Sequence, residues 1–307
     1  MIPKFICMIG LPASGKSTKA QELAREYNAT VFSADELRKE WYGNESIQGD
    51  NTKLFNTLHQ QIKTHLKNGY SAILDSTNLS YKHRMAFLLE LKNIPCEKIC
   101  VLMATPYEEC LKRNTKRERI VPVDVIERMY RSFDVAWYYE GWDDIQVEYS
   151  KYENYYGWVW DWVEKADDYE QKNSHHTLTL GEHCRQTMRN MNKLCAEYRP
   201  ITYTELQYAA LFHDEGKIFT QTFKNSKGEI TEQAHYYNHE RTGSYDSLFY
   251  EMSCNNLYVA ILIRWHMQPY FWEKDSHEKL CNKYRKLWGE ELYQDIMKLH
   301  EADKTAH

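Results

Sequence analysis

The stretch GLPASGKST at residues 10–18 constrains the fold of this chain more than any other feature of its sequence. It fits the pattern G-x-x-x-x-G-K-[ST] and directly follows FICMI at 5–9, an apolar run typical of a buried strand. The next segment, STKAQELAREY, has the composition of a helix. A strand, a glycine-rich loop and a helix in this order predict a phosphate-binding loop, because a chance turn would not account for all three elements.

The fixed positions of this pattern have distinct chemical uses. Gly10 and Gly15 let the backbone turn tightly, so that its N–H groups face phosphate oxygens. Lys16 bridges the β- and γ-phosphates, and the Ser17 hydroxyl reaches Mg²⁺. Thr18 completes the predicted cofactor-binding set at the positive end of the helix. The loop therefore predicts use of ATP with Mg²⁺ and leaves the phosphate acceptor open.

Bulk properties limit the classes of protein that fit. The 307 residues are enough for two domains with separate cores, and the net charge of −5 argues against a protein that coats nucleic acid by overall charge. The eight cysteines include no C-x-x-C pair and no leader precedes the first strand, which predicts reduced thiols in a cytoplasmic protein. No apolar run approaches the ~18 residues of a membrane-spanning helix, so we expect a soluble protein without a membrane partner.

The pattern of elements changes along the chain. Strand-like segments such as KICVLMAT alternate with helix-like ones such as HRMAFLLELKN, which predicts an α/β domain with a parallel sheet over 1–150. Helical segments separated by polar loops then predict an all-α domain over 175–307. Between them we expect an aromatic-rich linker at 151–174, whose Tyr and Trp side chains we assign to packing in preference to base stacking.

Polar residues follow two of the predicted strands. Asp35 comes after TVFSA and Arg38 follows three residues later, so on a helical turn both side chains face one pocket. A carboxylate there can accept a proton from an attacking hydroxyl, and an arginine can hold a phosphate of the acceptor. Asp75, at the end of YSAILD, is placed to act on the metal or its water, although a single polar residue at a strand end is unremarkable.

The basic stretch KRNTKRER at 112–119 allows two interpretations. It places Arg113 and Arg117 four residues apart on a predicted helix. A solvated basic face is the ordinary interpretation. The functional one is a lid, whose arginines stabilise the charge that develops on phosphoryl oxygens during transfer.

Four stretches taken in order, GLPASGKST, SADELRKE, ILDSTN and LKRNTKRERIVPVDVIERMY, resemble the 5′-hydroxyl polynucleotide kinases of phage and bacterial nucleic-acid repair. The resemblance covers most of residues 1–150 and favours the lid interpretation. It implies Asp35 as general base toward a 5′-OH, Arg38 on the acceptor phosphate, and Arg113 with Arg117 on the ATP phosphates.

The sequence departs from the family pattern at two places. The lid is shorter between Arg117 and Val121, which makes Arg119 a candidate to share the lid role. The motif DSTN has one residue more than DTN, so the role of Asp75 stays open.

Histidine and aspartate recur through the second half at His183, His213, Asp214, His239, His266 and Asp303. Imidazole and carboxylate groups converging in a helical core bind hard to borderline divalent metals and leave positions open for water. A lone histidine is more often an ordinary core or surface residue, and His175, His176 and His235 stay unassigned.

The stretches HHTLTLGEH, LFHDEGK, HYYNHE, RWHMQP and EADKTAH resemble the HD phosphohydrolase superfamily, above all HD domains of bacterial tRNA nucleotidyltransferases and those fused to polynucleotide kinases. This implies core metal ligands at His183, His213, Asp214 and Asp303, further ligands of a di-metal site at His239 and His266, and a phosphate contact at Lys217. Mn²⁺, Fe, Co²⁺, Ni²⁺ and Zn²⁺ all suit such ligands, and they would promote hydrolysis of phosphate esters.

The two resemblances together predict a bifunctional enzyme that heals nucleic-acid ends. A kinase would phosphorylate the 5′-OH end, and a phosphoesterase would remove the 2′,3′-cyclic, 2′- or 3′-phosphate from the other end. RNA or DNA ends are the expected substrates, and an RNA ligase is a candidate partner. The alternatives are a small-molecule kinase joined to an HD nucleotide phosphohydrolase, a protein whose HD half cleaves signalling nucleotides or deoxynucleotides, and a module that senses ATP without catalysis.

Overall fold

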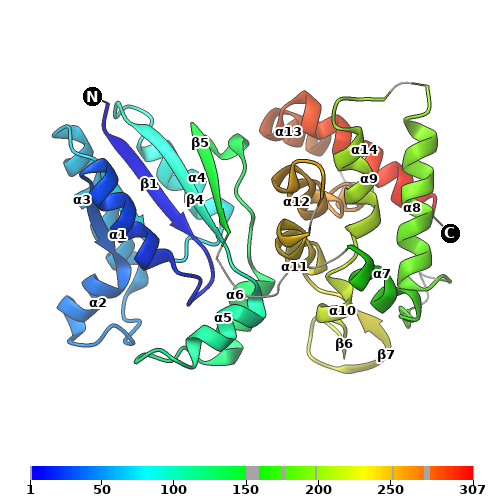
Figure 1. Ribbon diagram of the computed structural model, residues 1–307, viewed down its shortest axis with the longest axis horizontal. Coiled ribbons are helices and arrows are strands. Elements are labelled where there is room, and N and C mark those ends of the chain that lie inside the picture. The colour runs from blue at the N-terminus through cyan, green and yellow to red at the C-terminus, as the bar shows by residue number, and fades with distance from the viewer. Residues whose placement is uncertain are drawn as a thin grey trace. The chain divides into compact units, whose positions relative to one another are not determined.

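The structure is a computed structural model that describes residues 2–149, 159–173, 177–197, 199–250, 252–272 and 277–306 (Figure 1). Its contacts divide the chain into a first unit, Met1–Tyr130 with Ala136–Tyr152, and a second unit, Arg131–Val135 with Glu153–His307. Residues 151–158 and 174 of the predicted linker lie outside the described residues, as do His175 and His176.

A five-stranded sheet forms the centre of the first unit, and the prediction of a parallel α/β sheet is confirmed. The strand order is β2-β3-β1-β4-β5, with every neighbouring pair parallel. The central strand β1 places Ile6 between Ile73 and Ile99 of its neighbours. The strands are β1 (Lys4–Ile9), β2 (Thr30–Ser33), β3 (Ala72–Asp75), β4 (Glu97–Ala104) and β5 (Asp144–Tyr149).

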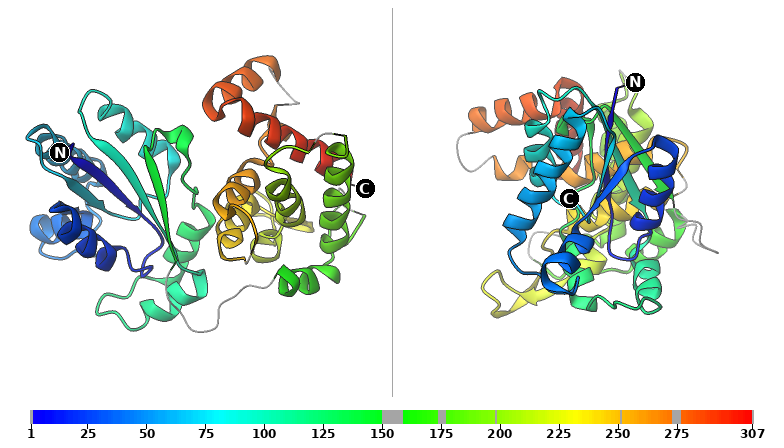
Figure 2. Two further views of the ribbon diagram at one scale, coloured as in Figure 1. Left: turned by 45° about the horizontal axis from the view of Figure 1, so that its top comes forward. Right: turned by 90° about the vertical axis from the view of Figure 1, so that its left-hand side faces the viewer.

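Helices cover both faces of this sheet (Figures 1 and 2). Because side chains alternate along a strand, Ile6 packs with Leu23 of α1 on one face, and Phe5 meets the ring of Phe87 of α4 at 5.2 Å on the other. The helices are α1 (Lys16–Tyr27), α2 (Ala34–Tyr42), α3 (Asn51–Lys67), α4 (Tyr81–Glu90), α5 (Tyr107–Asn114), α6 (Val123–Arg131) and the 3-10 turn η1 (Tyr138–Glu140).

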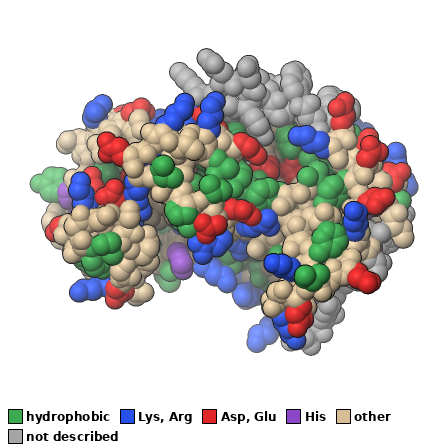
Figure 3. Space-filling model, turned by 90° about the horizontal axis from the view of Figure 1, so that it is seen from below, with side chains coloured by type: hydrophobic (Ala, Val, Ile, Leu, Met, Phe, Trp, Pro, Cys, Tyr) green, Lys and Arg blue, Asp and Glu red, His purple; other side chains and the backbone are tan. Residues whose placement is uncertain are grey.

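Polar loops gather at the edge where the parallel strands end, and hydrogen bonds tie them together. Thr105, after β4, donates its hydroxyl to the Ser14 carbonyl at 2.9 Å. Asn78, after β3, donates its side-chain amide to the Met8 carbonyl at 2.8 Å. Figure 3 faces this edge and shows Lys and Arg side chains interspersed with acidic ones. The parallel topology therefore brings three loops distant in sequence to one place.

The second unit is helical, as predicted, with α12 buried at its centre. Every residue of α12 from Leu257 to Trp265 is buried. The helices are α7 (Val159–Asp167), α8 (Leu180–Leu194), α9 (Tyr203–Phe212), α10 (Lys217–Thr220), α11 (His239–Asp246), α12 (Asn256–Trp265), α13 (His277–Trp288) and α14 (Glu290–Lys304), with 3-10 turns η2 (Ser247–Phe249) and η3 (Pro269–Phe271). No helix among the described residues is both long and apolar enough to cross a membrane.

An antiparallel hairpin interrupts this helical unit, so the description all-α omits one element. β6 (Thr222–Lys224) pairs with β7 (Ile230–His235), and Gly228 adopts a positive φ of 85° in the turn. The part of the predicted linker that the structure describes includes α7, where Trp162 is buried and meets the ring of Phe212 at 5.3 Å.

Five residues within the predicted first domain, 131–135, pack instead in the second unit. Phe133 is fully buried, and its ring lies 4.6 Å from that of Tyr245. The buried Asp134 accepts a hydrogen bond from Arg264 Nε at 2.7 Å. Because Arg264 lies 130 residues further along the chain, no local pattern could have assigned this segment to the second unit.

Candidate functional sites

The phosphate loop joins β1 to α1 at the strand-end edge of the first unit. Gly15 has a φ of +96°, a conformation that glycine adopts without steric cost. A Cβ on Gly10 would lie 2.6 Å from Ser14 Oγ and 3.0 Å from Met103 Cβ, so the loop needs glycine at both predicted positions. Lys16 Nζ donates to the Leu11 carbonyl at 2.7 Å, which folds the lysine back across the loop.

The electrostatics of the loop centre on Lys16. The residue is 8% exposed, and burial lowers the pKa of its ammonium to about 8 against the opposing effect of the Asp75 carboxylate. Asp75 ends β3 and is buried. Ser17 and Thr18 are exposed in the first turn of α1. A phosphate placed over this turn would meet both the ammonium and the N–H groups of a helix N-terminus.

Asp35 lies between two arginines in the first turn of α2. Arg38 Nη1 is 3.0 Å from one oxygen of its carboxylate, and Arg119 Nη1 is 2.9 Å from the other. The Asp35 side chain is 51% exposed, whereas Arg38 is buried. The carboxylate is thus held by two cations and remains open to solvent.

The three arginines of the lid segment differ in placement. Arg113 Nε donates to Glu109 Oε1 at 2.7 Å, one turn earlier on the same helix. Arg117 is exposed. Arg119 reaches the Asp35 carboxylate, as described above. The structure thus brings Arg119 into contact with Asp35, another predicted site residue.

Two side chains that fix the loops of this site were missed by the sequence analysis. Asn114 closes the lid loop, since its amide donates to the Val121 carbonyl at 2.8 Å and its oxygen accepts from the Val121 N–H at 3.0 Å. Arg84 forms a buried two-bond ion pair with Glu140, at 2.7 and 2.6 Å, and donates to the Asn78 carbonyl in the loop after β3. Arg84 and Glu140 are 56 residues apart, so no local sequence motif indicates the pair.

Six buried side chains converge in the second unit from five segments: His183 on α8, His213 and Asp214 after α9, His239 at the start of α11, His266 after α12, and Asp303 on α14. A capping box between Thr179 and Glu182 fixes the first turn of α8. The segment after Asp214 passes so close to α11 that a Cβ on Gly216 would lie 2.1 Å from the His239 carbonyl oxygen.

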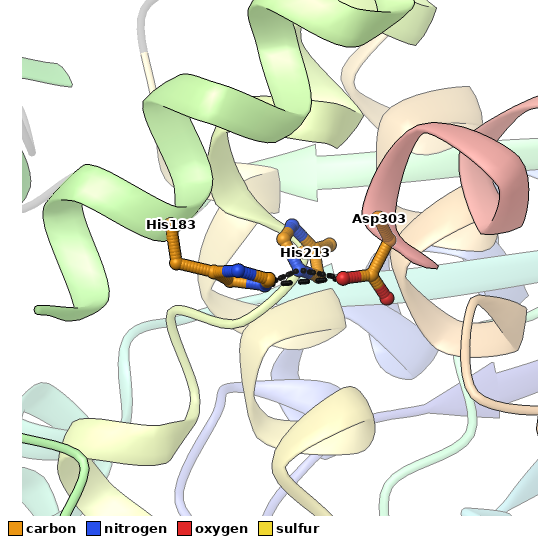
Figure 4. A group of neighbouring side chains, drawn as sticks. All are labelled: His183, His213 and Asp303. Atoms are coloured by element: carbon orange, nitrogen blue, oxygen red, sulfur yellow. Dashed lines mark hydrogen bonds and ion pairs between the residues drawn. The ribbon is translucent and has the colours of Figure 1, made fainter. Parts of the chain in front are cut away.

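The first group within this cluster is His183, His213 and Asp303 (Figure 4). Both imidazole Nε2 atoms face Asp303 Oδ1, at 3.0 Å for His183 and 3.3 Å for His213, and they lie 3.2 Å from each other. Asp214 Oδ2 adds a second carboxylate oxygen, 3.5 Å from His183 Nε2 and 3.3 Å from His213 Nε2.

The second group is Asp214, His239 and His266. Asp214 Oδ1 lies 3.1 Å from His239 Nε2 and 3.7 Å from His266 Nε2, and the two imidazole nitrogens are 3.3 Å apart. In each group the ligand atoms lie within 4.8 Å of one another, so each could hold a metal ion. Asp214 therefore presents one oxygen to each group.

Backbone carbonyls fix the tautomers of all four histidines. A carbonyl can only accept, so each Nδ1 carries a proton, and a neutral ring keeps its lone pair on Nε2. The four Nδ1 donate to carbonyls of Ala306 (3.0 Å), Ala210 (3.0 Å), Tyr236 (2.8 Å) and Ile263 (2.7 Å), from His183, His213, His239 and His266 in that order. Two lone pairs that face each other at little more than 3 Å repel, so a proton or a cation between them is favoured.

The carboxylates supply strong negative potential in this cluster. Burial opposes the charge on His213, but Asp214 and Asp303 outweigh it and raise the pKa of the imidazole to about 10. Burial also opposes the charge on Asp214, yet Lys217 and His213 hold the pKa of this carboxyl well below its usual range. A cation is therefore favoured among these side chains.

Lys217 and Tyr270 contact members of the cluster, and Gln171 in turn contacts Lys217. Lys217 Nζ lies 2.6 Å from Asp214 Oδ2 and donates to Gln171 Oε1 at 2.8 Å. Tyr270 donates its hydroxyl to Asp303 Oδ2 at 2.9 Å. Lys217 was a predicted site residue, whereas Gln171 and Tyr270 were missed. Gln171 lies in the predicted linker, where its composition gave no signal, and Tyr270 follows His266 by four residues.

Comparison with known proteins agrees with the architecture of the first unit. Residues 5–136 match the family model described as an AAA domain. Together with the parallel sheet and the loop geometry, this match defines the first unit as a kinase fold of the P-loop type, which implies ATP and Mg²⁺.

Particular relatives resemble about half of the chain. An L-seryl-tRNA(Sec) kinase of Methanococcus maripaludis is 29% identical over 157 residues, which are 47% of this chain and 58% of the relative. The chain therefore spans well under two thirds of that relative. Among solved structures, a gluconokinase from Sinorhizobium meliloti is 13% identical with a TM-score of 0.37, covering 50% of this chain and 85% of its own. A chain in the structure of the Pnkp1/Rnl/Hen1 RNA repair complex is 24% identical with a TM-score of 0.36. The match covers 42% of this chain and 43% of that one.

Proposed function

We propose that this chain is a bifunctional enzyme that heals nucleic-acid ends, with a polynucleotide 5′-kinase in the first unit and an HD phosphohydrolase in the second. The observation that carries the proposal is the presence, in one chain, of a loop built for nucleotide phosphates and a separate buried cluster of four histidines and two aspartates. Ribonucleolytic cleavage leaves a 5′-OH on one fragment and a cyclic phosphate on the other. The two sites would act on these two ends.

In the first unit, Asp35 would accept the proton of the acceptor 5′-OH as the oxygen attacks the γ-phosphorus of ATP. The bond between this phosphorus and the β–γ bridging oxygen breaks, and ADP leaves. Lys16, through its position in the loop, would neutralise the phosphates, and Arg119 would add charge from the lid. Arg38 would hold the first phosphate of the acceptor, and its contact with Asp35, the proposed general base, supports this role.

In the second unit, the donor set fits one or two divalent metals. The four histidines offer Nε2 lone pairs and Asp214 offers one oxygen to each group, a mixture that suits Mn²⁺, Fe, Co²⁺, Ni²⁺ or Zn²⁺. A metal held there would act as a Lewis acid on the phosphoryl group and on water. Asp303 would add a carboxylate oxygen to the first group, and Lys217 would bind a phosphate oxygen.

Two other acceptors fit the kinase site. A small metabolite would pair the first unit with an HD nucleotide phosphohydrolase. The name of the Methanococcus relative adds the seryl group of a tRNA as a candidate hydroxyl. A module that senses ATP without catalysis fits less well, because Lys16, Asp35 and Arg38 are all present at the loop.

The experiment that tests the proposal uses an RNA with a 5′-OH and a 2′,3′-cyclic phosphate, incubated with the protein, ATP, Mg²⁺ and Mn²⁺. We expect the RNA to gain a 5′-phosphate and lose the cyclic phosphate, both visible by mass spectrometry. Phosphorylation of a metabolite or of seryl-tRNA with no change at the 5′ end would reject the polynucleotide acceptor. An unchanged 3′ end across the candidate metals would reject the phosphohydrolase.

A further inference from the structure

Helix α3 begins at the residue that anchors the arginine proposed to bind the acceptor phosphate. Arg38 Nη2 donates to Asn51 Oδ1 at 2.9 Å, and Asn51 is the first residue of α3. The first half of α3 therefore starts beside the point where the acceptor strand would enter. The proposed role of α3 below rests on the 5′-kinase function.

The composition of α3 sets it apart within a chain of negative net charge. Its 17 residues, NTKLFNTLHQQIKTHLK, include three lysines and no aspartate or glutamate. The apolar side chains Leu54, Leu58 and Ile62 face the core. The opposite side, exposed at Asn56 and Gln60, carries amides. No acidic side chain of the helix would repel a polyanion such as a nucleic-acid backbone, so a polyanion can approach this side.

An open hollow of about 570 Å³ lies along this half of the helix. Its lining includes Asp50, Thr52, Lys53, Asn56 and Gln60. Asp50 is the one acidic residue among these, and its carboxylate caps the helix by accepting from the Lys53 N–H at 2.9 Å. The residues that line the hollow are polar or charged in type, and they include one ammonium and several groups that can donate hydrogen bonds.

Lys53, which lines the hollow, lies beside Trp41 of α2. The Lys53 ammonium lies 5.6 Å from the centroid of the Trp41 ring, and in the described part of the chain no carboxylate pairs with it. The Tyr42 hydroxyl accepts from the Asp50 N–H at 3.3 Å, which anchors the loop between the two helices. A free cation beside an indole is a combination that binds phosphates and bases of single strands.

We propose that this surface, defined by Trp41, Lys53, Asn56 and Gln60 and called here the α3 surface, binds the nucleotides that follow the 5′-OH nucleotide of a single-stranded acceptor. Lys53 pairs with a backbone phosphate, the amides of Asn56 and Gln60 donate to phosphate or base oxygens, and Trp41 stacks on a base. Arg38 and the α3 surface then contact successive parts of one strand. The acceptor is accordingly an oligonucleotide and not a free nucleotide.

The test compares acceptors of different length with variants of matched charge. RNAs of two and of ten nucleotides, each with a 5′-OH and a 3′-OH so that the second unit has no substrate, are phosphorylated by the full-length wild type, Lys53→Ala and Lys67→Ala. Lys67 is exposed in the last turn of the same helix and serves as control. Binding of the ten-nucleotide RNA is followed in parallel by fluorescence anisotropy over a range of salt.

We expect wild-type kcat/KM to be higher for the longer RNA, and Lys53→Ala to lower that value about tenfold while leaving the dinucleotide unchanged. The slope of log Kd against log salt should fall by about 0.7 in Lys53→Ala, the value for one phosphate contact on a single strand. Lys67→Ala should change neither quantity.

Three results would overturn the proposed role of the α3 surface and leave the kinase function standing. They are equal losses on both RNAs, equal effects of the two lysine variants, and wild-type rates that do not depend on RNA length. RNA binding that depends on Lys53 without phosphorylation would instead reject the kinase function and keep the surface. No detectable binding of the ten-nucleotide RNA and no phosphorylation would reject both.

Discussion

The two candidate sites are built in opposite ways. The phosphate loop is one continuous stretch whose backbone does much of the binding, and its neighbours Asp35 and Arg119 remain partly open to solvent. The cluster of the second unit draws on residues from 183 to 303, all buried, with each ring anchored through Nδ1. A site built mainly from backbone groups can be recognised in the sequence as a short motif. A site built from side chains of several helices forms only when those helices pack together.

Two histidines show what this difference means for charge. His59 in the first unit stacks on Phe87 at 3.7 Å, and burial lowers the pKa of its imidazole to about 4. His213 in the second unit is fully buried, but two aspartates raise the pKa of its imidazole to about 10. Burial alone expels a proton, whereas burial between carboxylates attracts a cation.

The largest expected effect separates the two sites by mutation. Lys16→Ala should lower 5′ phosphorylation about 10³-fold, some 4 kcal/mol of transition-state stabilisation, and leave 3′-end hydrolysis intact. Asp214→Ala should do the reverse, because it removes an oxygen from both metal groups. Both ends of the RNA are assayed, with Lys19→Ala, one turn along α1, as the unaffected control. Loss of both activities in either variant would break the comparison.

The next effect concerns stability of the first unit alone. Glu140→Gln leaves the buried Arg84 without a charged partner, and we expect about 3 kcal/mol less free energy of unfolding. The matched control, Glu97→Gln, breaks a partly exposed pair with Lys4 and should cost less than about 1 kcal/mol. Urea unfolding measures the loss in each variant. The transition of the first unit is identified as the one that shifts when ATP is added. Equal losses would mean that Arg84 gains nothing from its buried partner.

A smaller effect distinguishes the lid arginines. Arg119→Ala should lower kcat/KM for 5′ phosphorylation about tenfold to a hundredfold, the value of one charge-assisted contact in the site. Arg113→Ala should change it less, because Arg113 pairs with Glu109 on its own helix. Steady-state kinetics on one RNA acceptor compare them. The reverse order would show that the lid rearranges when ATP binds.

The last effect is a pH dependence from His59. The pKa of its imidazole is about 4 when folded against 6.5 ordinarily, so the unfolded chain takes up the proton first as pH falls. The contribution to stability is present above pH 6.5 and is lost toward pH 4, with a slope of at most about 1.4 kcal/mol per pH unit. His59→Gln should flatten the unfolding free energy of the first unit over this range. An unchanged slope would assign the acid sensitivity to other groups.

Sequence reasoning reached the elements of the first unit because their signals are local. The apolar run before Gly10, the glycine spacing and the alternation of strands and helices predicted the parallel sheet that is observed. The same reasoning missed Asn114, Arg84 and Gln171. Arg84 and Gln171 act through partners 56 and 46 residues away, and no local motif indicates those contacts. Asn114 lies within the basic stretch at 112–119, but its bonds to Val121 become evident only when the loop is folded.

The sequence by itself determined the phosphate loop, the parallel sheet of the first unit and the types of residue that are available as metal ligands in the second. These follow from backbone conformation and hydrophobic periodicity, which act over a few residues. Only the tertiary structure decided that Arg119 reaches Asp35, that 131–135 pack in the second unit, and that Asp214 gives one oxygen to each group. Such placements depend on distances between side chains far apart in the chain, and those distances are set only when the cores close.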